Sequence, residues 1–195
     1  MLLFGERSTP DSLRVRTMKN YVQLKFITIY GAPIFLHWSV LCVAGGVLAL
    51  SIKSPILAAI AICSYFGVIL LHEFGHAFFA HRYECRINAI RLSVFHGSCE
   101  YDGTYLYSEK EEVIISWGGV LAQFVVAIPL IVLSKIPVLG EVDAFGPIVA
   151  FGGYISLLVA VVNLAPSPFL DGGKAWKIVP IFLSEVKTRE KKKRS

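Results

Sequence analysis

The sequence predicts an all-α, polytopic membrane protein with about four to six transmembrane helices and short membrane-associated β-strands near its cytoplasmic face. Composition is the first observation: of 195 residues, 55% are hydrophobic and 17% are charged, and the mean hydropathy is +0.62. These values are far from those of a soluble globular domain. The second observation is that the apolar residues gather in long stretches, and the third is that nearly all basic residues lie between those stretches.

Four stretches are long enough for transmembrane helices, namely residues 34–52, 56–81, 113–134 and 145–165. Each is close to the ~20 apolar residues that cross a hydrocarbon core of ~30 Å. Two further segments favour strands. Residues 21–30 have high β propensity and are expected to form an edge strand, and residues 87–107 are expected to form a short hairpin around Gly97.

The basic residues predict the orientation in the membrane. All but Lys53 and Lys135 of the nineteen Lys and Arg residues lie before the first stretch, between the second and third, or after the fourth. Because positively charged short loops are retained in the cytoplasm, we expect both termini to be cytoplasmic, in the cell (inner) membrane if the source is prokaryotic. The net charge of +5 is then mainly a topological signal.

The chain is expected to divide into a cytoplasmic N-terminal segment with the edge strand (residues 1–33), an intramembrane core (34–184) and a basic cytoplasmic tail (185–195). The tail suggests contact with anionic lipid headgroups. Nucleic acid is not an expected partner, because no aromatic residues interleave with the basic ones and no recognition module is present.

The second apolar stretch contains an H-E-x-x-H pattern at residues 72–76. His72 and His76 are four residues apart, so on a helix they project from one face and could chelate one zinc ion. Glu73 lies roughly 100° around the helix from His72, where it can act as a general base without being a ligand. Chance matches to this pattern occur in soluble proteins, but ionisable groups inside a membrane helix are costly unless paired or metal-bound. We therefore expect a metal site.

A catalytic zinc ion takes three protein ligands and leaves one position for water, and Asp171 is the best candidate for the third ligand. Of the fourteen acidic residues, only Glu73 and Asp171 are tied to apolar segments rather than to charged loops. The fourth stretch ends in two prolines and two glycines, as a broken helix that lines a cavity does. His72 lies about 24 Å along the second span from its start, and the fourth span ends about 27 Å from its own start. Both motifs are therefore expected at similar depth in the membrane. The alternative is that Asp171 is an ordinary turn residue.

These residues resemble the site-2 protease family of intramembrane zinc metalloproteases. Residues 72–77 with Ala80 are similar to the metal-binding helix of that family, and its second motif is similar to Asn163-x-x-Pro166-x-Pro168-x-Leu170-Asp171-Gly172-Gly173. Weaker similarity extends to His37-Trp38-Ser39 and to residues 118–123. The resemblance runs from about residue 30 to residue 173. It indicates a minimal form in which the PDZ and CBS domains of many relatives are not expected.

The resemblance implies a zinc-dependent intramembrane endopeptidase that cleaves membrane proteins in or near their transmembrane segments, in regulated intramembrane proteolysis. One zinc ion would be held by His72, His76 and Asp171, with Glu73 as the catalytic residue. The family usually has Gly-Pro and then Asn in the third span, whereas this chain has Gly119-Val120 and Gln123. Gln123 keeps an amide and is expected to hold the substrate backbone. Asn163 is a second candidate for substrate binding, with orientation of the Asp171 loop or capping of the helix as alternatives.

A transmembrane substrate must unwind before its peptide bonds can be attacked. We expect the strand at residues 24–30, or the hairpin strand at 87–94, to hold the unwound peptide by strand addition. The expected partners are thus a membrane protein or peptide substrate and the lipid bilayer. A membrane di-iron oxygenase or desaturase is disfavoured, because its sites use many histidines and this chain has five. A non-proteolytic metal-binding or transport protein, with Glu73 as a ligand or ion relay, stays as the alternative.

Overall fold

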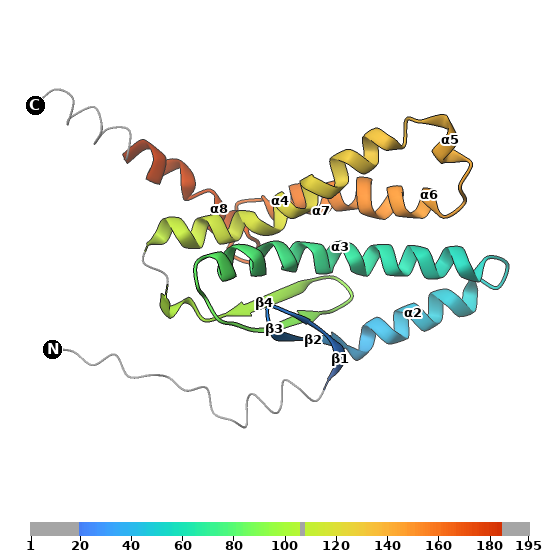
Figure 1. Ribbon diagram of the computed structural model, residues 1–195, viewed down its shortest axis with the longest axis horizontal. Coiled ribbons are helices and arrows are strands. Elements are labelled where there is room, and N and C mark those ends of the chain that lie inside the picture. Colours follow the sequence, from blue (N-terminus) through green and yellow to red (C-terminus); the bar gives the residue numbers. More distant parts are fainter. Residues whose placement is uncertain (1–19, 106–107, 185–195) are drawn as a thin grey trace, which may run out of the picture.

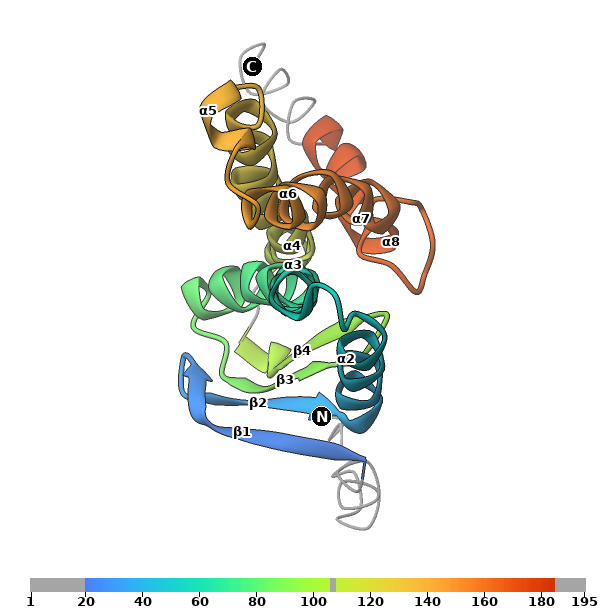
Figure 2. The same ribbon diagram turned by 90° about the vertical axis from the view of Figure 1, so that its right-hand side faces the viewer.

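The computed structural model describes residues 20–105 and 108–184, which form one small sheet and a set of long apolar helices (Figure 1). The tail expected at residues 185–195 and most of the expected N-terminal segment lie outside the described residues. Figure 2 shows the sheet on one side of helix α3 (Pro55–Arg82) and the remaining long helices on the other. The fold therefore places α3 at the centre of the molecule.

Two hairpins build the sheet, in the strand order β1-β2-β3-β4. Strand β1 (Tyr21–Ile29) pairs antiparallel with β2 (Ala32–His37), and β3 (Ile87–Leu92) pairs antiparallel with β4 (Gly97–Tyr101). Parallel pairing of β2 with β3 joins the hairpins. The two-residue turn between β1 and β2 has positive φ angles of 50° and 79°, as a type I′ turn requires, and glycine at its second position accommodates this. The edge strand expected at residues 21–30 is confirmed.

The strand at residues 87–92 is not open to a substrate. Because β3 has β2 on one side and β4 on the other, both of its edges are already hydrogen-bonded. The expectation that this strand could accept an unwound peptide is therefore wrong. The outer strands are β4, which packs on α3, and β1 at the opposite edge.

The first apolar stretch does not form the helix expected over residues 34–52. Its first residues belong to β2, where Ile34, Phe35 and Leu36 pair with β3. Helix α2 (Trp38–Leu50) follows, and the His37 side chain accepts a hydrogen bond from the Ser39 backbone N–H at 3.3 Å to cap it. Thirteen residues of helix measure about 20 Å, less than the ~30 Å of a hydrocarbon core. The expected first span is thus corrected to a strand followed by a short apolar helix.

Three helical segments of the described chain are long and apolar enough to cross a membrane. The first is α3, where proline stands at the start of the helix and needs no hydrogen-bond acceptor for a backbone N–H. The second is α4 (Glu109–Leu133), with three acidic residues in its first turn that match the helix dipole. The third runs through α6 (Phe145–Ile148), the π-helical segment η2 (Val149–Ile155) and α7 (Ser156–Asn163).

Short helical turns connect or follow these segments: η1 (Gly103–Tyr105), α5 (Pro137–Gly140) and α8 (Gly172–Ala175). The long helices expose apolar side chains on their outer faces, such as Val125 at 73% and Leu158 at 58%. Lipid would cover such side chains at no cost, which agrees with a membrane protein.

Helix α3 contacts the sheet and α4 in different ways. Toward the sheet, Ala77 and Ala80 pack in one apolar core with the fully buried Ile34 and Ile90. Toward α4, the two backbones touch, because a Cβ atom on Gly75 would lie 2.2 Å from the carbonyl oxygen of Gly118. Glycine on both helices thus brings α4 close enough for its side chains to reach the histidines of α3.

Candidate metal centre

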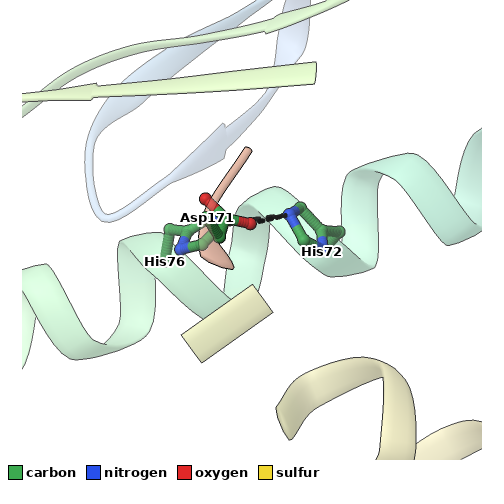
Figure 3. A group of neighbouring side chains, drawn as sticks. All are labelled: His72, His76 and Asp171. Carbon is green, nitrogen blue, oxygen red and sulfur yellow. Dashed lines mark hydrogen bonds and ion pairs between the residues drawn. The ribbon is translucent and has the colours of Figure 1, made fainter. Parts of the chain in front are cut away.

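Two histidines and one aspartate from distant parts of the chain meet at one point (Figure 3). His72 and His76 lie one turn apart on α3, and Asp171 comes from the segment between α7 and α8. The distance from Asp171 Oδ2 is 2.9 Å to His72 Nε2 and 3.2 Å to His76 Nε2, and the two Nε2 atoms are 3.0 Å apart. Among the described residues, these three side chains form a group whose ligand atoms are close enough together to hold one metal ion.

The hydrogen bonds behind the imidazoles determine which ring nitrogens can bind a cation. His76 Nδ1 lies 2.8 Å from the backbone oxygen of Ile115, and His72 Nδ1 lies 3.0 Å from Gln123 Oε1. Both partners are acceptors in this arrangement, so a neutral ring that donates from Nδ1 would present the lone pair of its Nε2.

With both rings neutral in that tautomer, three lone-pair atoms face one another. Acceptors about 3 Å apart repel unless a cation lies between them, and an ion about 2.0 Å from each atom fits a triangle of this size. Two nitrogens and one carboxylate oxygen form a set that suits zinc. The residues present thus fit a divalent metal ion.

A glycine on α4 leaves room for both imidazoles. A Cβ atom on Gly119 would lie 2.6 Å from His72 Cε1 and 2.6 Å from His76 Nε2. Ile115, Gly119 and Gln123 are spaced by four residues, so they form one row along α4 that faces the two rings. The sequence indicated this segment through its family resemblance but did not predict that it packs behind the two histidine rings. The four-residue spacing around a glycine was the signal available.

Glu73 is buried on the same helix but does not belong to the three-atom group. Its side chain lies against β4, where a Cβ atom on Gly97 would come within 2.5 Å of Glu73 Oε1. Burial and the Glu73 charge raise the pKa of the Cys99 thiol to about 12, so this thiol is neutral at physiological pH. Strand β4 thus packs against the Glu73 carboxylate beside the candidate metal ligands.

The segment that carries Asp171 is anchored on both sides. Trp176 Nε1 donates to the Leu164 backbone oxygen at 2.6 Å, and Trp117 Nε1 on α4 donates to the Ala175 backbone oxygen at 3.1 Å. Ion pairs of 2.7 Å, Lys174 to Glu112 and Lys177 to Glu109, add contacts with the start of α4. Indole N–H groups bonded to main-chain oxygens fix the turn more firmly than exposed ion pairs do.

A cavity of about 640 Å³ opens beside the site, and its lining includes His72, Glu73, His76, Asp171 and Asn163. Asn163 is the last residue of α7 and so lies where a substrate could reach it. Gln123 does not line this cavity: it is fully buried, with its oxygen on the His72 ring. The structure therefore does not bring Gln123 to the place expected of a residue that holds the substrate.

No protein-family model matches the chain. A zinc metalloprotease of Methanocaldococcus jannaschii is 26% identical over 161 residues, which are 82% of this chain and 46% of that protein. The solved structure of the site-2 protease from Methanocaldococcus jannaschii has the same fold, with a TM-score of 0.63 and 24% identity over 82% of this chain and 71% of that one. The chain therefore shares the fold of a site-2 protease and is similar in sequence to a zinc metalloprotease.

The chain spans about half the length of the curated protein that it matches. Its own candidate metal ligands lie on two elements, α3 and the turn after α7, which are separated by nearly a hundred residues of sequence.

Proposed function

We propose that the chain is a zinc-dependent intramembrane endopeptidase that hydrolyses peptide bonds in or near transmembrane segments of membrane proteins, in regulated intramembrane proteolysis. The observation that carries this proposal is the position of Glu73. It follows the candidate ligand His72 on a helix of membrane-spanning length, it is 4% exposed, and it lines the same cavity as all three candidate ligands. A site that only stored or structured a metal ion would gain nothing from a buried carboxylate in this place.

The names of the two similar proteins, a zinc metalloprotease and a site-2 protease, support both the ion and the reaction class. We propose one zinc ion, held by His72 Nε2, His76 Nε2 and a carboxylate oxygen of Asp171. When bound, zinc supplies a Lewis acid that polarises a carbonyl and lowers the pKa of water.

Glu73 performs the proton transfers in this proposal. Its carboxylate takes a proton from the attacking water as the bond between the water oxygen and the carbonyl carbon forms. It then gives that proton to the amide nitrogen as the carbon–nitrogen bond breaks, which balances the reaction and restores the carboxylate. The contact with β4 keeps the carboxylate pointed at the cavity during both steps.

The experiment is a cleavage assay on single-span membrane proteins reconstituted in liposomes, with zinc analysis of each variant. Glu73→Gln should keep its zinc and lose cleavage by at least ~10²-fold, because the amide cannot accept the proton. Glu141→Gln is the matched control, because Glu141 lies in an exposed turn outside the site and its loss should leave cleavage unchanged.

Proteolysis that persists in Glu73→Gln would remove this residue from the mechanism. Zinc uptake into the liposomes without cleavage by the wild-type chain would instead indicate the metal-transport alternative. The two results are distinguishable because uptake and cleavage are measured on the same vesicles.

We propose that the unwound substrate adds as a strand to the outer edge of β4. This edge strand lines the cavity and touches Glu73, whereas β1 is at the far edge of the sheet. A backbone held there would be extended and open to attack. A photo-crosslinking residue in place of the exposed Ser98 on β4 should capture substrate, and the same residue in place of the exposed Val22 on β1 should not. The opposite pattern would contradict the proposal.

A further inference from the structure

Gln123 is the one fully buried amide side chain on the face of α4 behind the histidines. Its exposure is 0%, its Oε1 lies 3.0 Å from His72 Nδ1, and among the described residues its Nε2 has no hydrogen-bond partner. An unpaired amide in a buried place costs stability that an apolar side chain of the same size would not. The hydrogen bond between Gln123 Oε1 and His72 Nδ1 is the interaction that offsets this cost in stability.

We infer that Gln123 is a positioning residue, which holds the His72 ring in the tautomer with Nδ1 protonated and leaves Nε2 free to bind the metal. This inference rests on the metal site of the proposed function. An acceptor behind a metal-binding histidine fixes both the tautomer and the orientation of the ring. Without it, the ring could rotate or place its proton on Nε2, and either change would remove a ligand.

The second histidine supports this interpretation independently. His76 Nδ1 donates to the backbone oxygen of Ile115, which can only accept, so its Nε2 also faces the centre. Ile115 and Gln123 are eight residues apart on α4, and Gly119 between them leaves space for both rings. One face of one helix therefore orients both imidazoles. One partner is main chain, which substitution leaves in place, and the other is the Gln123 side chain, which can be tested.

The test measures zinc affinity by chelator competition on the whole 195-residue chain in detergent, with Co²⁺ absorption spectra as a second readout. Gln123→Met keeps the volume but has no strong acceptor, and it should bind zinc about 10- to 100-fold more weakly and change the Co²⁺ spectrum. Gln123→Glu restores an acceptor and should recover the affinity.

Ser156→Ala is the matched control. Ser156 is also fully buried, its Oγ also lacks a partner among the described residues, and it begins α7 without lining the cavity beside the histidines. Loss of this hydroxyl should leave zinc affinity and the Co²⁺ spectrum unchanged. Gln123→Met that binds zinc within twofold of wild type, with the same spectrum, would overturn the inference.

A measurement on the unsubstituted chain covers the case in which Gln123→Met does not fold. In zinc-free protein at pH 8, ¹⁵N shifts of labelled histidine report the tautomer of each ring, and loss of one signal in His72→Asn assigns His72. We expect Nδ1 of His72 to be protonated, and a neutral His72 ring whose one proton is on Nε2 would overturn the inference. A wild-type chain that binds no zinc would refute the metal site itself, whereas zinc binding with the wrong tautomer refutes only the role of Gln123.

Discussion

At the scale of single residues, space around the two imidazoles decides whether three ligand atoms can meet. His72 and His76 are held about 3 Å apart at their Nε2 atoms, and α4 passes directly behind them. Gly119 is the residue at that crossing, and any side chain there would occupy the volume of the rings. A small residue at this position is therefore as necessary to the site as the candidate ligands are.

Gly119→Ala should lower zinc affinity at least tenfold, because its new methyl group would displace both ligand rings. The measurement is chelator competition, with thermal unfolding of the zinc-free protein alongside it. Gly67→Ala on α3 is the control, since a Cβ atom there meets nothing within 4 Å and should leave zinc affinity unchanged. Wild-type affinity in Gly119→Ala would show that the rings are not confined in this way.

At the scale of elements, the sequence predicted best where local pattern and local structure coincide. The two histidines at a four-residue spacing predicted their shared helix face, and the prolines and glycines after residue 163 predicted a break at Asp171. Both features depend only on neighbouring residues. The structure then brings His72, His76 and Asp171 together, which the similar depth of the two motifs had suggested.

In the first apolar stretch, the local sequence pattern is not enough to predict the secondary structure. Ile34, Phe35 and Leu36 are equally suited to a membrane helix and to a buried strand. Their pairing partner is β3, more than fifty residues later in the chain, so only the tertiary fold could assign them to a strand. The same limit applies to Gln123, whose contact with His72 depends on how closely Gly75 and Gly118 let α3 and α4 approach.

At the scale of the whole molecule, the fold groups the connections of the helices at two ends. Figure 1 shows the turn from α2 to α3 and helix α5 at one end of the long helices, and α8 at the other. Lys53 lies in that turn and Lys135 lies between α4 and α5, and these are the two basic residues that the charge pattern assigns to the non-cytoplasmic side. The arrangement is compatible with that assignment, which stays a prediction.

Labelling of single cysteines in a chain without its four native ones tests the topology. Cysteine in place of Lys53 or Lys135 should react with a membrane-impermeant maleimide in intact cells, because both sites should face outward. Cysteine in place of Lys110, at the start of α4, should react only after the cells are permeabilised. Labelling of the Lys110 position in intact cells would reverse the orientation.

The claim on which the whole molecule depends is that α3 and the turn after α7 share one metal ion. X-ray absorption spectroscopy of the zinc-loaded chain, together with Asp171→Ala, tests it most directly. We predict one zinc ion per wild-type chain, with nitrogen and oxygen neighbours at about 2.0 Å and the scattering pattern of two imidazoles, and loss of stoichiometric zinc in Asp171→Ala. Sulfur neighbours at about 2.3 Å, or an unchanged spectrum in Asp171→Ala, would contradict it.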